Sequence, residues 1–351
     1  MSADFLVYGS YGFTGSLAVE QALSRGLSPM LAGRRAEPVE RQATEFDCPH
    51  RVFSLEHPTV IADQLDDVDV LLNCAGPFSS TAEPLVSACL ATGTDYIDVT
   101  GEYEVIDRIA DLDRDAEQAG VTLLPGVGFD VVPSDCLAAS IAGELPEATT
   151  LELAIDGGTT ISQGTAKALV EGLGSPGAIR QDGRIEHVPV ASKRRQIDFG
   201  DGPKPTMTIP WGDLVTAYHS TGIGDIEVYT AVPGPAITVM RRTRPLGPVL
   251  RAQPVQRLLK RLVEATVTGP SAEQRAENVC HVWGRVSNED GDSVTGRLRT
   301  PDPYETTRLT TVEAVSRLLD DSVSSGFQTP ATAFGAGFAT EFDEIERIDR
   351  D

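Results

Sequence analysis

The chain has 351 residues, of which 52 are acidic and 29 basic, so its formal net charge is −23 at pH 7. This acidity argues against nucleic acid as a partner, because binding to a phosphate backbone requires a basic surface. Hydrophobic residues make up 40% of the chain, and its length is sufficient for two domains with ordinary cores.

Lysine is scarce, since only four of the basic residues are lysines. A dense carboxylate surface with few lysines is typical of proteins that stay hydrated in high salt. We therefore expect a halophilic protein, and the alternative is an ordinary acidic cytosolic enzyme.

Five scattered cysteines form no Cys-x-x-Cys pair, which favours reduced thiols over a disulfide framework or a zinc site. No metal is expected. The N-terminus lacks the charged and apolar stretches of a signal peptide, and no run approaches the roughly 18 apolar residues of a membrane-spanning helix. These features predict a cytoplasmic location.

Strand and helix signals alternate through the first 145 residues. Short apolar runs predict strands at 5–8, 29–33, 51–55, 68–76, 95–99 and 121–125. A helical pattern follows residue 15, and others lie at 36–46, 58–65, 81–92 and 103–119. The alternation predicts an α/β Rossmann fold, a doubly wound parallel sheet in which ligands bind beyond the carboxyl ends of the strands.

The pattern changes after about residue 148. Residues 151–155 alternate in polarity like a half-buried strand, and further β-like runs lie at 205–210, 226–232, 236–241, 279–288 and 292–299. A last helix is predicted at 306–323. These signals indicate a second, α+β domain that is mostly antiparallel.

The first strand ends in three glycines spaced three apart, Gly9, Gly12 and Gly15, and a helix follows. Glycines allow a tight turn and a close approach to a pyrophosphate, which the N-terminus of the helix can bind. The candidate cofactor contacts in this loop are Gly9, Ser10, Tyr11, Gly12, Phe13, Thr14 and Gly15. A strand–helix turn without a ligand is the alternative.

The end of the second strand reads Ala32-Gly33-Arg34-Arg35, with no acidic residue before Glu37. Enzymes that use NAD place an acid here for the ribose 2′-hydroxyl, whereas positive charge suits the 2′-phosphate of NADP. Gly33, Arg34 and Arg35 therefore predict NADP(H). The alternative is that both arginines merely balance an acidic surface.

The ends of later strands supply further cofactor contacts, namely Ala75, Gly76, Pro77, Thr100 and Gly101. None of the seven tyrosines precedes a lysine by four residues, so the Tyr-x-x-x-Lys pair of short-chain dehydrogenases is missing. No Gly-x-Ser-x-Gly or His-Glu-x-x-His motif is present either.

The motifs resemble the saccharopine dehydrogenase-like oxidoreductase family, including its trans-acting enoyl reductase branch. The matching segments are 8–15, 32–35, 73–78, 96–102 and 128–135, with a weaker match at 326–331. The resemblance implies an NADP-binding Rossmann domain at 1–132 and an inserted α+β substrate or dimerisation domain at 133–305. It also implies a C-terminal segment, 306–351, that packs back on the first domain.

Hydride transfer is the chemistry of the cofactor, and the protein supplies orientation and a proton. Candidate proton carriers at the strand ends are Asp98, Glu102, Asp130, Ser134 and Asp135. Asp98 has an alternative role in ordering its loop, and Asp130 and Asp135 in capping the next helix, which we favour for Asp135. We take Glu102, Asp130 and Ser134 as the candidate catalytic residues.

Between Glu227 and Glu264 the chain has no acidic residue and seven basic ones. Residues 255–263 form an apolar helical stripe, with Arg257, Lys260 and Arg261 expected on the opposite face. Such a helix can lie on an anionic membrane or hold a lipid-like substrate. Covering the sheet or forming a homodimer contact is the alternative, and the one that we favour.

Together these features predict an oxidoreductase that transfers a hydride between NADP(H) and a C=C, C=O or C=N bond of a small or lipid-linked metabolite. A non-catalytic dinucleotide-binding module or membrane-associated scaffold is the alternative. An amino-acid substrate, as in true saccharopine enzymes, is a weaker third option.

Overall fold

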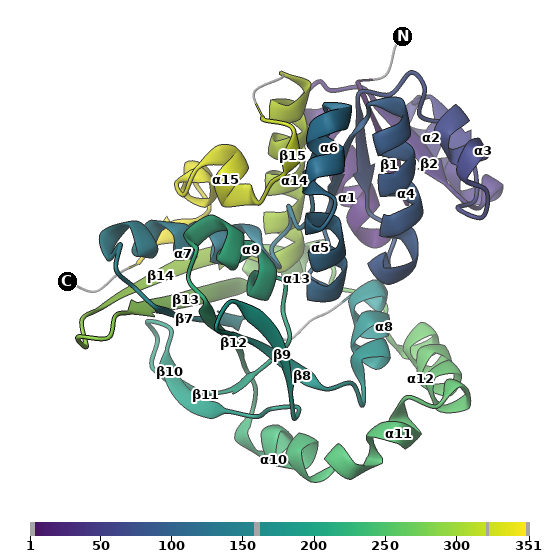
Figure 1. The fold of residues 1–351 in the computed structure, drawn as a ribbon. Helices are drawn as coiled ribbons and strands as arrows, with labels where there is room; N and C mark the ends of the chain where they lie inside the picture. The colour runs from purple at the N-terminus through teal and green to yellow at the C-terminus, as the bar shows by residue number, and fades with distance from the viewer. Residues whose placement is uncertain (1–3, 158–161, 321–322, 349–351) are drawn as a thin grey trace. The chain divides into compact units, whose positions relative to one another are not determined.

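The computed structural model describes residues 4–157, 162–320 and 323–348 (Figure 1). The chain divides into two compact units. The first comprises Met1–Val132 and Tyr304–Gly335, and the second comprises Pro133–Pro303 and Ala336–Asp351. Each unit is therefore assembled from two separate stretches of the chain.

The first unit is built on a seven-stranded sheet in which every pairing is parallel. The strands lie in the order β15–β6–β5–β4–β1–β2–β3. Their bounds are β1 Phe5–Tyr8, β2 Pro29–Gly33, β3 His50–Val52, β4 Val70–Asn73, β5 Asp95–Asp98, β6 Thr122–Leu124 and β15 Gly326–Phe327. The order β3–β2–β1–β4–β5–β6 is that of dinucleotide-binding folds. From β1, strands β2 and β3 are added on one side and strands β4, β5 and β6 on the other, so the strand order switches between β1 and β4.

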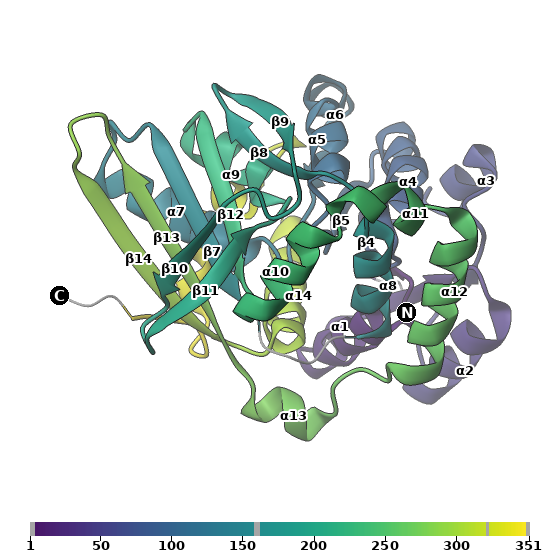
Figure 2. The same ribbon diagram turned by 90° about the horizontal axis from the view of Figure 1, so that it is seen from below.

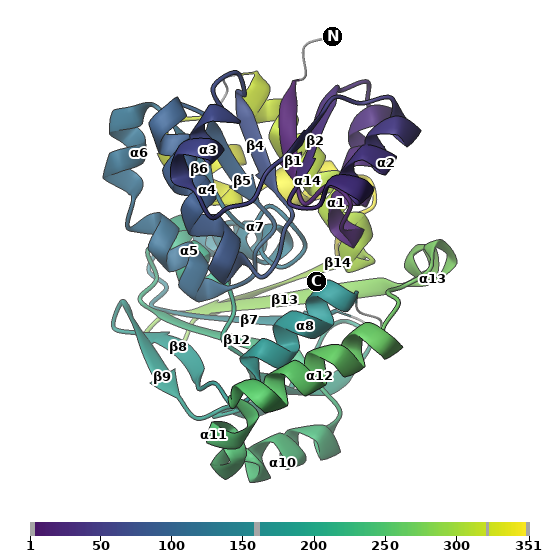
Figure 3. The same ribbon diagram turned by 90° about the vertical axis from the view of Figure 1, so that its right-hand side faces the viewer.

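Helices cover both faces of this sheet, as Figure 3 shows for α4, α5 and α6 on one face and for α1, α2 and α14 on the other. Their bounds are α1 Phe13–Ser24, α2 Ala36–Phe46, α3 Pro58–Asp63, α4 Phe78–Thr92, α5 Tyr103–Ala110, α6 Asp113–Ala119, α14 Pro303–Leu319 and α15 Pro330–Phe334. Because helices lie on both sides, all residues of β1 and β4 are buried. The predicted doubly wound α/β fold is confirmed.

The single helix predicted at 103–119 is two helices in the structure, α5 and α6. Asp113 and Asp115 occupy the first turn of α6, where carboxylates interact favourably with the helix dipole. The Asp113 carboxylate also accepts a hydrogen bond from the backbone of Phe327 in β15 at 2.8 Å. The break between α5 and α6 therefore places Asp113 where it can anchor the edge strand β15. Helical periodicity in the sequence does not reveal this tertiary contact.

The second unit contains a nine-stranded mixed sheet, with β10–β11–β12–β7–β13–β14–β16 in order and β8 bridging β12 and β9. Its pairings are antiparallel except for β12 with β7. The bounds are β7 Thr150–Asp156, β8 Gly177–Gln181, β9 Arg184–Val188, β10 Arg194–Asp198, β11 Pro203–Thr208, β12 Asp225–Ala231, β13 Val279–Ser287, β14 Ser293–Pro301 and β16 Glu346–Arg347. Residues from Ala336 onward thus belong with the second unit. The resemblance described above implies instead that all of 306–351 packs on the first unit.

The helices of the second unit lie on and beside this sheet (Figure 2). They are α7 Val132–Glu144, α8 Gln163–Gly172, α9 Asp213–Thr221, α10 Gly234–Arg242, η1 Arg244–Leu246, α11 Gly247–Leu250, α12 Gln253–Thr266, α13 Ala272–Glu277 and η2 Phe338–Glu341. A Cβ at Gly284 of β13 would lie 3.0 Å from Ile141, so α7 packs closely on that strand. Within the described ranges, no helix is long and apolar enough to cross a bilayer.

The β-like run predicted at 236–241 is wrong, because these residues belong to helix α10. Proline stands in its first turn, where the fixed φ angle favours helix initiation. Ile237 is the buried residue of this helix, so the apolar run is a narrow inward stripe and not a half-buried strand.

Candidate functional site

The glycine-rich loop lies at the carboxyl end of β1, where the strand order of the sheet reverses. Gly9 has a φ angle of +83°, and a Cβ there would lie 2.9 Å from the Cβ of Ala75. A Cβ at Gly15 would lie only 2.3 Å from the carbonyl oxygen of Gly9. Both positions require glycine, and the loop lies directly against the segment that follows β4.

Helix α1 begins after this loop with an N-terminus suited to an anion. Its N-cap residue is Gly12, which has no side chain to satisfy the first N–H groups, and its first turn contains no carboxylate. Phe13, Thr14 and Gly15 provide the backbone N–H groups of this turn. The Ser10 hydroxyl is buried and has no hydrogen-bond partner among the described residues. These features fit a phosphate-bearing ligand.

The arginines that follow β2 lie beside the same loop. The Arg35 guanidinium lies 5.1 Å from the centre of the Tyr11 ring, and a Cβ at Gly33 would come within 2.5 Å of that ring. Arg34 is exposed. Neither arginine pairs with a carboxylate among the described residues, and Glu37 pairs with Arg41 instead. The two charges are therefore not used to balance a nearby acid.

Gln42 of α2 fixes the glycine-rich loop through hydrogen bonds, a role that the sequence does not predict. Its amide nitrogen donates to the Ser10 carbonyl at 2.9 Å and to the Ser16 hydroxyl at 3.2 Å. Gln42 is only 7% exposed and lies among the apolar residues Val39 and Ala43 on the inward face of α2. A polar residue on the apolar face of a predicted helix is the signal that would have identified it.

The loop after β4 is fixed by the side chain of Asn73. Its carbonyl oxygen accepts from the backbone N–H of Ala75 at 3.0 Å, and its amide donates to Thr81 and Tyr96 at 3.2 and 3.1 Å. The Thr81 hydroxyl donates to the carbonyl of Ala75 at 2.6 Å. These bonds define the path of Ala75, Gly76 and Pro77 into α4.

Glu102 is engaged at the start of α4. Its two carboxylate oxygens accept the backbone N–H groups of Phe78 and Ser79 at 3.0 and 3.1 Å. A carboxylate at this position satisfies unpaired donors and interacts favourably with the helix dipole. The structure thus gives this candidate catalytic residue a capping role.

Asp98 stands at the centre of a buried polar network. One oxygen accepts from the N–H groups of Thr100 and Gly126 at 3.0 and 2.9 Å, and the other accepts from the Tyr96 hydroxyl at 2.8 Å. Burial raises the pKa of Asp98 to about 6, against the lowering effect of these hydrogen bonds. Asp98 therefore ties together the loops that follow β5 and β6.

Asp130 lies against the backbone of Gly101, since a Cβ at Gly101 would come within 2.8 Å of a carboxylate oxygen of Asp130. The Asp130 side chain is partly exposed, and burial raises its pKa to about 6. Thr100 is buried, and its hydroxyl accepts from the backbone N–H of Glu102 at 3.0 Å. Asp98, Thr100, Gly101, Glu102 and Asp130 thus meet at one edge of the sheet.

Ser134 and Asp135 belong to the second unit, in the first turn of α7. Both are buried. Because α7 begins at Val132, Asp135 is inside the helix and not at the N-cap position that the sequence analysis favours. Its carboxylate accepts a hydrogen bond from the Ser220 hydroxyl of α9 at 2.5 Å.

Threonines of α14 brace the loop that precedes Asp130. Thr307 accepts a hydrogen bond from the backbone N–H of Phe129 at 3.0 Å, and Thr310 donates to the carbonyl of Val127 at 2.7 Å. The ring of Tyr304 meets that of Phe13 edge to face, with centroids 4.9 Å apart. Residues near the end of the chain therefore support the loops at the carboxyl edge of the sheet.

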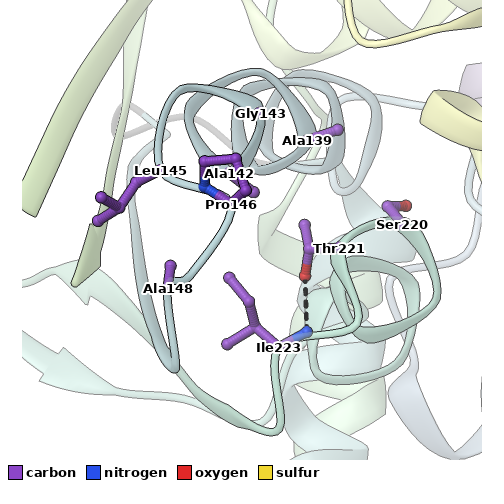
Figure 4. Close-up of a pocket in the computed structure, with 9 residues that line it drawn as sticks. All are labelled: Ala139, Ala142, Gly143, Leu145, Pro146, Ala148, Ser220, Thr221 and Ile223. Atoms are coloured by element: carbon purple, nitrogen blue, oxygen red, sulfur yellow. Dashed lines mark hydrogen bonds between the residues drawn. The ribbon is translucent and has the colours of Figure 1, made fainter. Parts of the chain in front are cut away.

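A hollow of about 310 Å³ lies in the second unit (Figure 4). Its lining comprises Ala139, Ala142, Gly143, Leu145, Pro146, Ala148, Ser220, Thr221 and Ile223. None of these residues is a predicted site residue or carries an ionisable side chain. Among the described residues there is also no cluster of three or more metal-ligating side chains.

Comparison with known proteins finds a family match for the N-terminal part of the chain. Residues 5–124 match the family model described as the saccharopine dehydrogenase NADP binding domain. This stretch contains the glycine-rich loop, both arginines and Glu102, so the resemblance is confirmed for the N-terminal part of the chain.

Two curated relatives illustrate the similarity. The trans-acting enoyl reductase of Mycobacterium leprae is 35% identical over 140 residues, covering 38% of this chain and 34% of the relative. The saccharopine dehydrogenase-like oxidoreductase of Bos taurus is 25% identical over 218 residues, covering 54% of this chain and 51% of the relative. The chain spans between a third and about half of the length of these relatives.

The fold is also found in a solved structure. Apo saccharopine dehydrogenase (L-Glu forming) from Saccharomyces cerevisiae matches with a TM-score of 0.66 over 99% of this chain and all of that chain. The sequence identity is 12%, so this likeness concerns the fold alone. The second sheet unit is part of the shared fold.

Proposed function

We propose that the protein is an NADP(H)-dependent oxidoreductase of the saccharopine dehydrogenase-like type. It would transfer a hydride between the nicotinamide and a C=C, C=O or C=N bond of a small or lipid-linked metabolite. The observation that carries the proposal is that Arg34 and Arg35 follow β2 without a carboxylate partner in the described ranges, and that Arg35 lies over Tyr11 of the glycine-rich loop.

The proposed cofactor contacts follow the carboxyl edge of the first sheet. The Gly9–Gly15 loop and the N-terminus of α1 would bind the pyrophosphate, and Arg34 and Arg35 the 2′-phosphate. The segments Ala75–Pro77 and Thr100–Gly101 would border the nicotinamide half. The bound cofactor supplies the hydride, and the residues of the chain orient it, exclude water and move a proton.

Among the predicted catalytic residues, Asp130 is the best placed to carry that proton. A pKa near 6 makes its carboxyl group an effective acid close to neutral pH. Both oxygens of Glu102 accept hydrogen bonds from α4, which favours a role in positioning the loop. Ser134, which is buried in the first turn of α7, is the third proposed catalytic residue.

The test of cofactor choice is a calorimetric titration with NADPH and NADH at the same salt concentration. Each guanidinium–phosphate hydrogen bond contributes about 1.5–3 kcal/mol, so NADPH should bind about 10- to 100-fold more tightly than NADH. The double variant R34Q/R35Q should lose this preference while its affinity for NADH changes little. R41Q is a matched control, because Arg41 is exposed on helix α2, which follows the two arginines, and pairs with Glu37.

Two results would contradict the proposal. If neither nucleotide binds to the folded chain, the loop is a strand–helix turn without a ligand. If NADH binds more tightly than NADPH, Arg34 and Arg35 have no part in recognition of the 2′-phosphate.

The second unit would bind the substrate or join two copies into a homodimer, and the enzyme would work in a cytoplasm with high salt. No step in this proposal involves a metal.

A non-catalytic dinucleotide-binding module remains the second candidate, and the capping role of Glu102 is the observation that favours it. The two candidates differ in turnover. Oxidation of NADPH by any enoyl, carbonyl or imine substrate in a broad panel supports the enzyme, whereas binding without turnover across that panel supports the module.

A further inference from the structure

The second unit carries a run of consecutive helices, α10, η1, α11 and α12, that forms a curved outer edge (Figures 1 and 2). We call residues 234–266 the basic arc. It contains seven cationic residues and one carboxylate, Glu264, so its net charge is +6 in a chain whose total is −23. The sign of the charge is thus reversed on this edge.

Most of the positive charge on the basic arc is available to a partner. Two of its cations bind groups outside the arc, since Arg244 donates to the carbonyls of Val190 and Ala191 and Lys260 pairs with Glu171. The other five are Arg241, Arg242, Arg251, Arg257 and Arg261. None of these five pairs with a carboxylate within the described parts of the chain.

The basic arc also exposes large apolar side chains. Leu258 and Leu262 of α12 are 59% and 52% exposed, and no residue of α12 is buried. Val239, Leu246 and Val249 are exposed to a similar extent along the rest of the arc. Large apolar side chains that are exposed this close together on a surface usually mark a site that binds a partner.

The contacts between α12 and α8 define which side of α12 faces outward. Gln256 donates to the carbonyl of Val170 at 2.9 Å, and Glu264 pairs with Lys167 at 2.8 Å. The exposed residues of α12 include Arg257, Leu258, Arg261 and Leu262, whereas Val255, Leu259 and Val263 are partly buried. The sequence predicts an apolar stripe opposite the cations, but the exposed part of this stripe, Leu258 and Leu262, lies among the arginines.

We propose that the basic arc binds the surface of an anionic phospholipid membrane. Arginine binds phosphate oxygens in a bidentate manner, and the leucines between the arginines can enter the boundary of the acyl chains. The positive arc complements lipid phosphate, whereas the rest of this acidic chain is repelled by it. A symmetric contact with a second copy of the chain fits less well, because it would place two arcs of net charge +6 against each other.

The test is flotation of the full chain with vesicles of phosphatidylcholine alone and of phosphatidylcholine with phosphatidylglycerol. It is performed at the lowest salt concentration at which circular dichroism shows the folded protein. We expect binding to the anionic vesicles only. The variants R257Q/R261Q and L258S/L262S should each reduce it by roughly tenfold or more, since one charge near such a surface contributes about fivefold.

The matched control is R184Q/R194Q, which removes two exposed arginines of the same unit outside the basic arc and should bind like the native chain. Circular dichroism of all variants reports that they are folded and does not depend on lipid or nucleotide. The proposal is overturned if the native chain does not bind anionic vesicles, or if the arc variants bind as well as the control. It is also overturned if the arc variants abolish a dimer measured by light scattering, because a second copy would then cover the arc.

Discussion

At the scale of the residue, the two carboxyl groups with raised pKa values differ in their surroundings. Both Asp98 and Asp130 have a pKa of about 6, and burial is the main cause for each. Asp98 is fully buried and accepts three hydrogen bonds, two from the backbone of the loops around it and one from the Tyr96 hydroxyl. Asp130 is partly exposed at the same edge, so a structural role suits Asp98 and a chemical role suits Asp130.

The variant D130N tests the chemical role. Because Asn cannot donate an acidic proton, kcat for NADPH-dependent reduction should fall by about 100-fold, while the Kd for NADPH changes by less than about threefold. In the native enzyme the protonated acid is lost as pH rises through about 6, so kcat should fall above that pH. The measurement is a steady-state pH profile with a substrate from the panel. An unchanged profile in D130N would assign the proton to another group.

The variant D98N tests the effect of burial on stability. The pKa of Asp98 in the folded state, about 6, lies above the ordinary value of 3.8. Between pH 3.8 and about 6 the folded chain therefore keeps a proton on Asp98 that the unfolded chain has lost. The native chain should therefore lose stability relative to D98N as pH rises from about 4 to 6, by up to about 3 kcal/mol. Urea unfolding of both chains across this range measures the difference, which should be constant above pH 7. A constant difference throughout would contradict the raised pKa.

At the scale of the element, α14 acts as a brace for the loop over residues 127–129. The variant T307V replaces the acceptor for the buried N–H of Phe129 by a methyl group of similar size. An unsatisfied buried donor costs about 1–3 kcal/mol, so the free energy of unfolding should fall by that amount. T238V on exposed α10 is the control and should change stability by less than about 0.5 kcal/mol. Equal effects of the two variants would show that α14 does not brace the loop.

The elements of the first unit were largely predictable because each has a strong local signal. Strands β1 and β2 and helix α2 have the predicted bounds, since an apolar run or a clear helical period defines each of them. Strand β3 is shorter than predicted. Strand β15 has two residues and forms by pairing with β6, from which it is separated by about 200 residues. Such long-range pairing leaves no local pattern.

The candidate site was predictable where geometry restricts the residue type. Gly9 and Gly15 are required by close backbone contacts, so the glycine spacing was informative. Gln42 and Thr307 act through hydrogen bonds across the unit, and nothing near them in the sequence indicates their partners. The capping role of Glu102 was missed for the same reason, because α4 begins 24 residues earlier.

At the scale of the whole molecule, the net charge of −23 should make stability depend on salt. Repulsion between carboxylates opposes the compact state, and its range falls to about 3 Å at 1 M salt. The Tm should therefore rise steadily from low to molar KCl, as differential scanning calorimetry can measure. A Tm that is highest at low salt would contradict the halophilic proposal.

The division of the first unit between two stretches of chain has a consequence for biosynthesis. Its last strand and its bracing helix come from residues 304–335, after the whole of the second unit up to Pro303 has been made. A ribosome-bound chain that ends before Tyr304 has six strands of the first sheet but lacks the threonines that hold residues 127–129. The loops at the nucleotide edge should therefore stay unbraced in the nascent protein until residues 304–310 have been made, long after the strands that carry these loops.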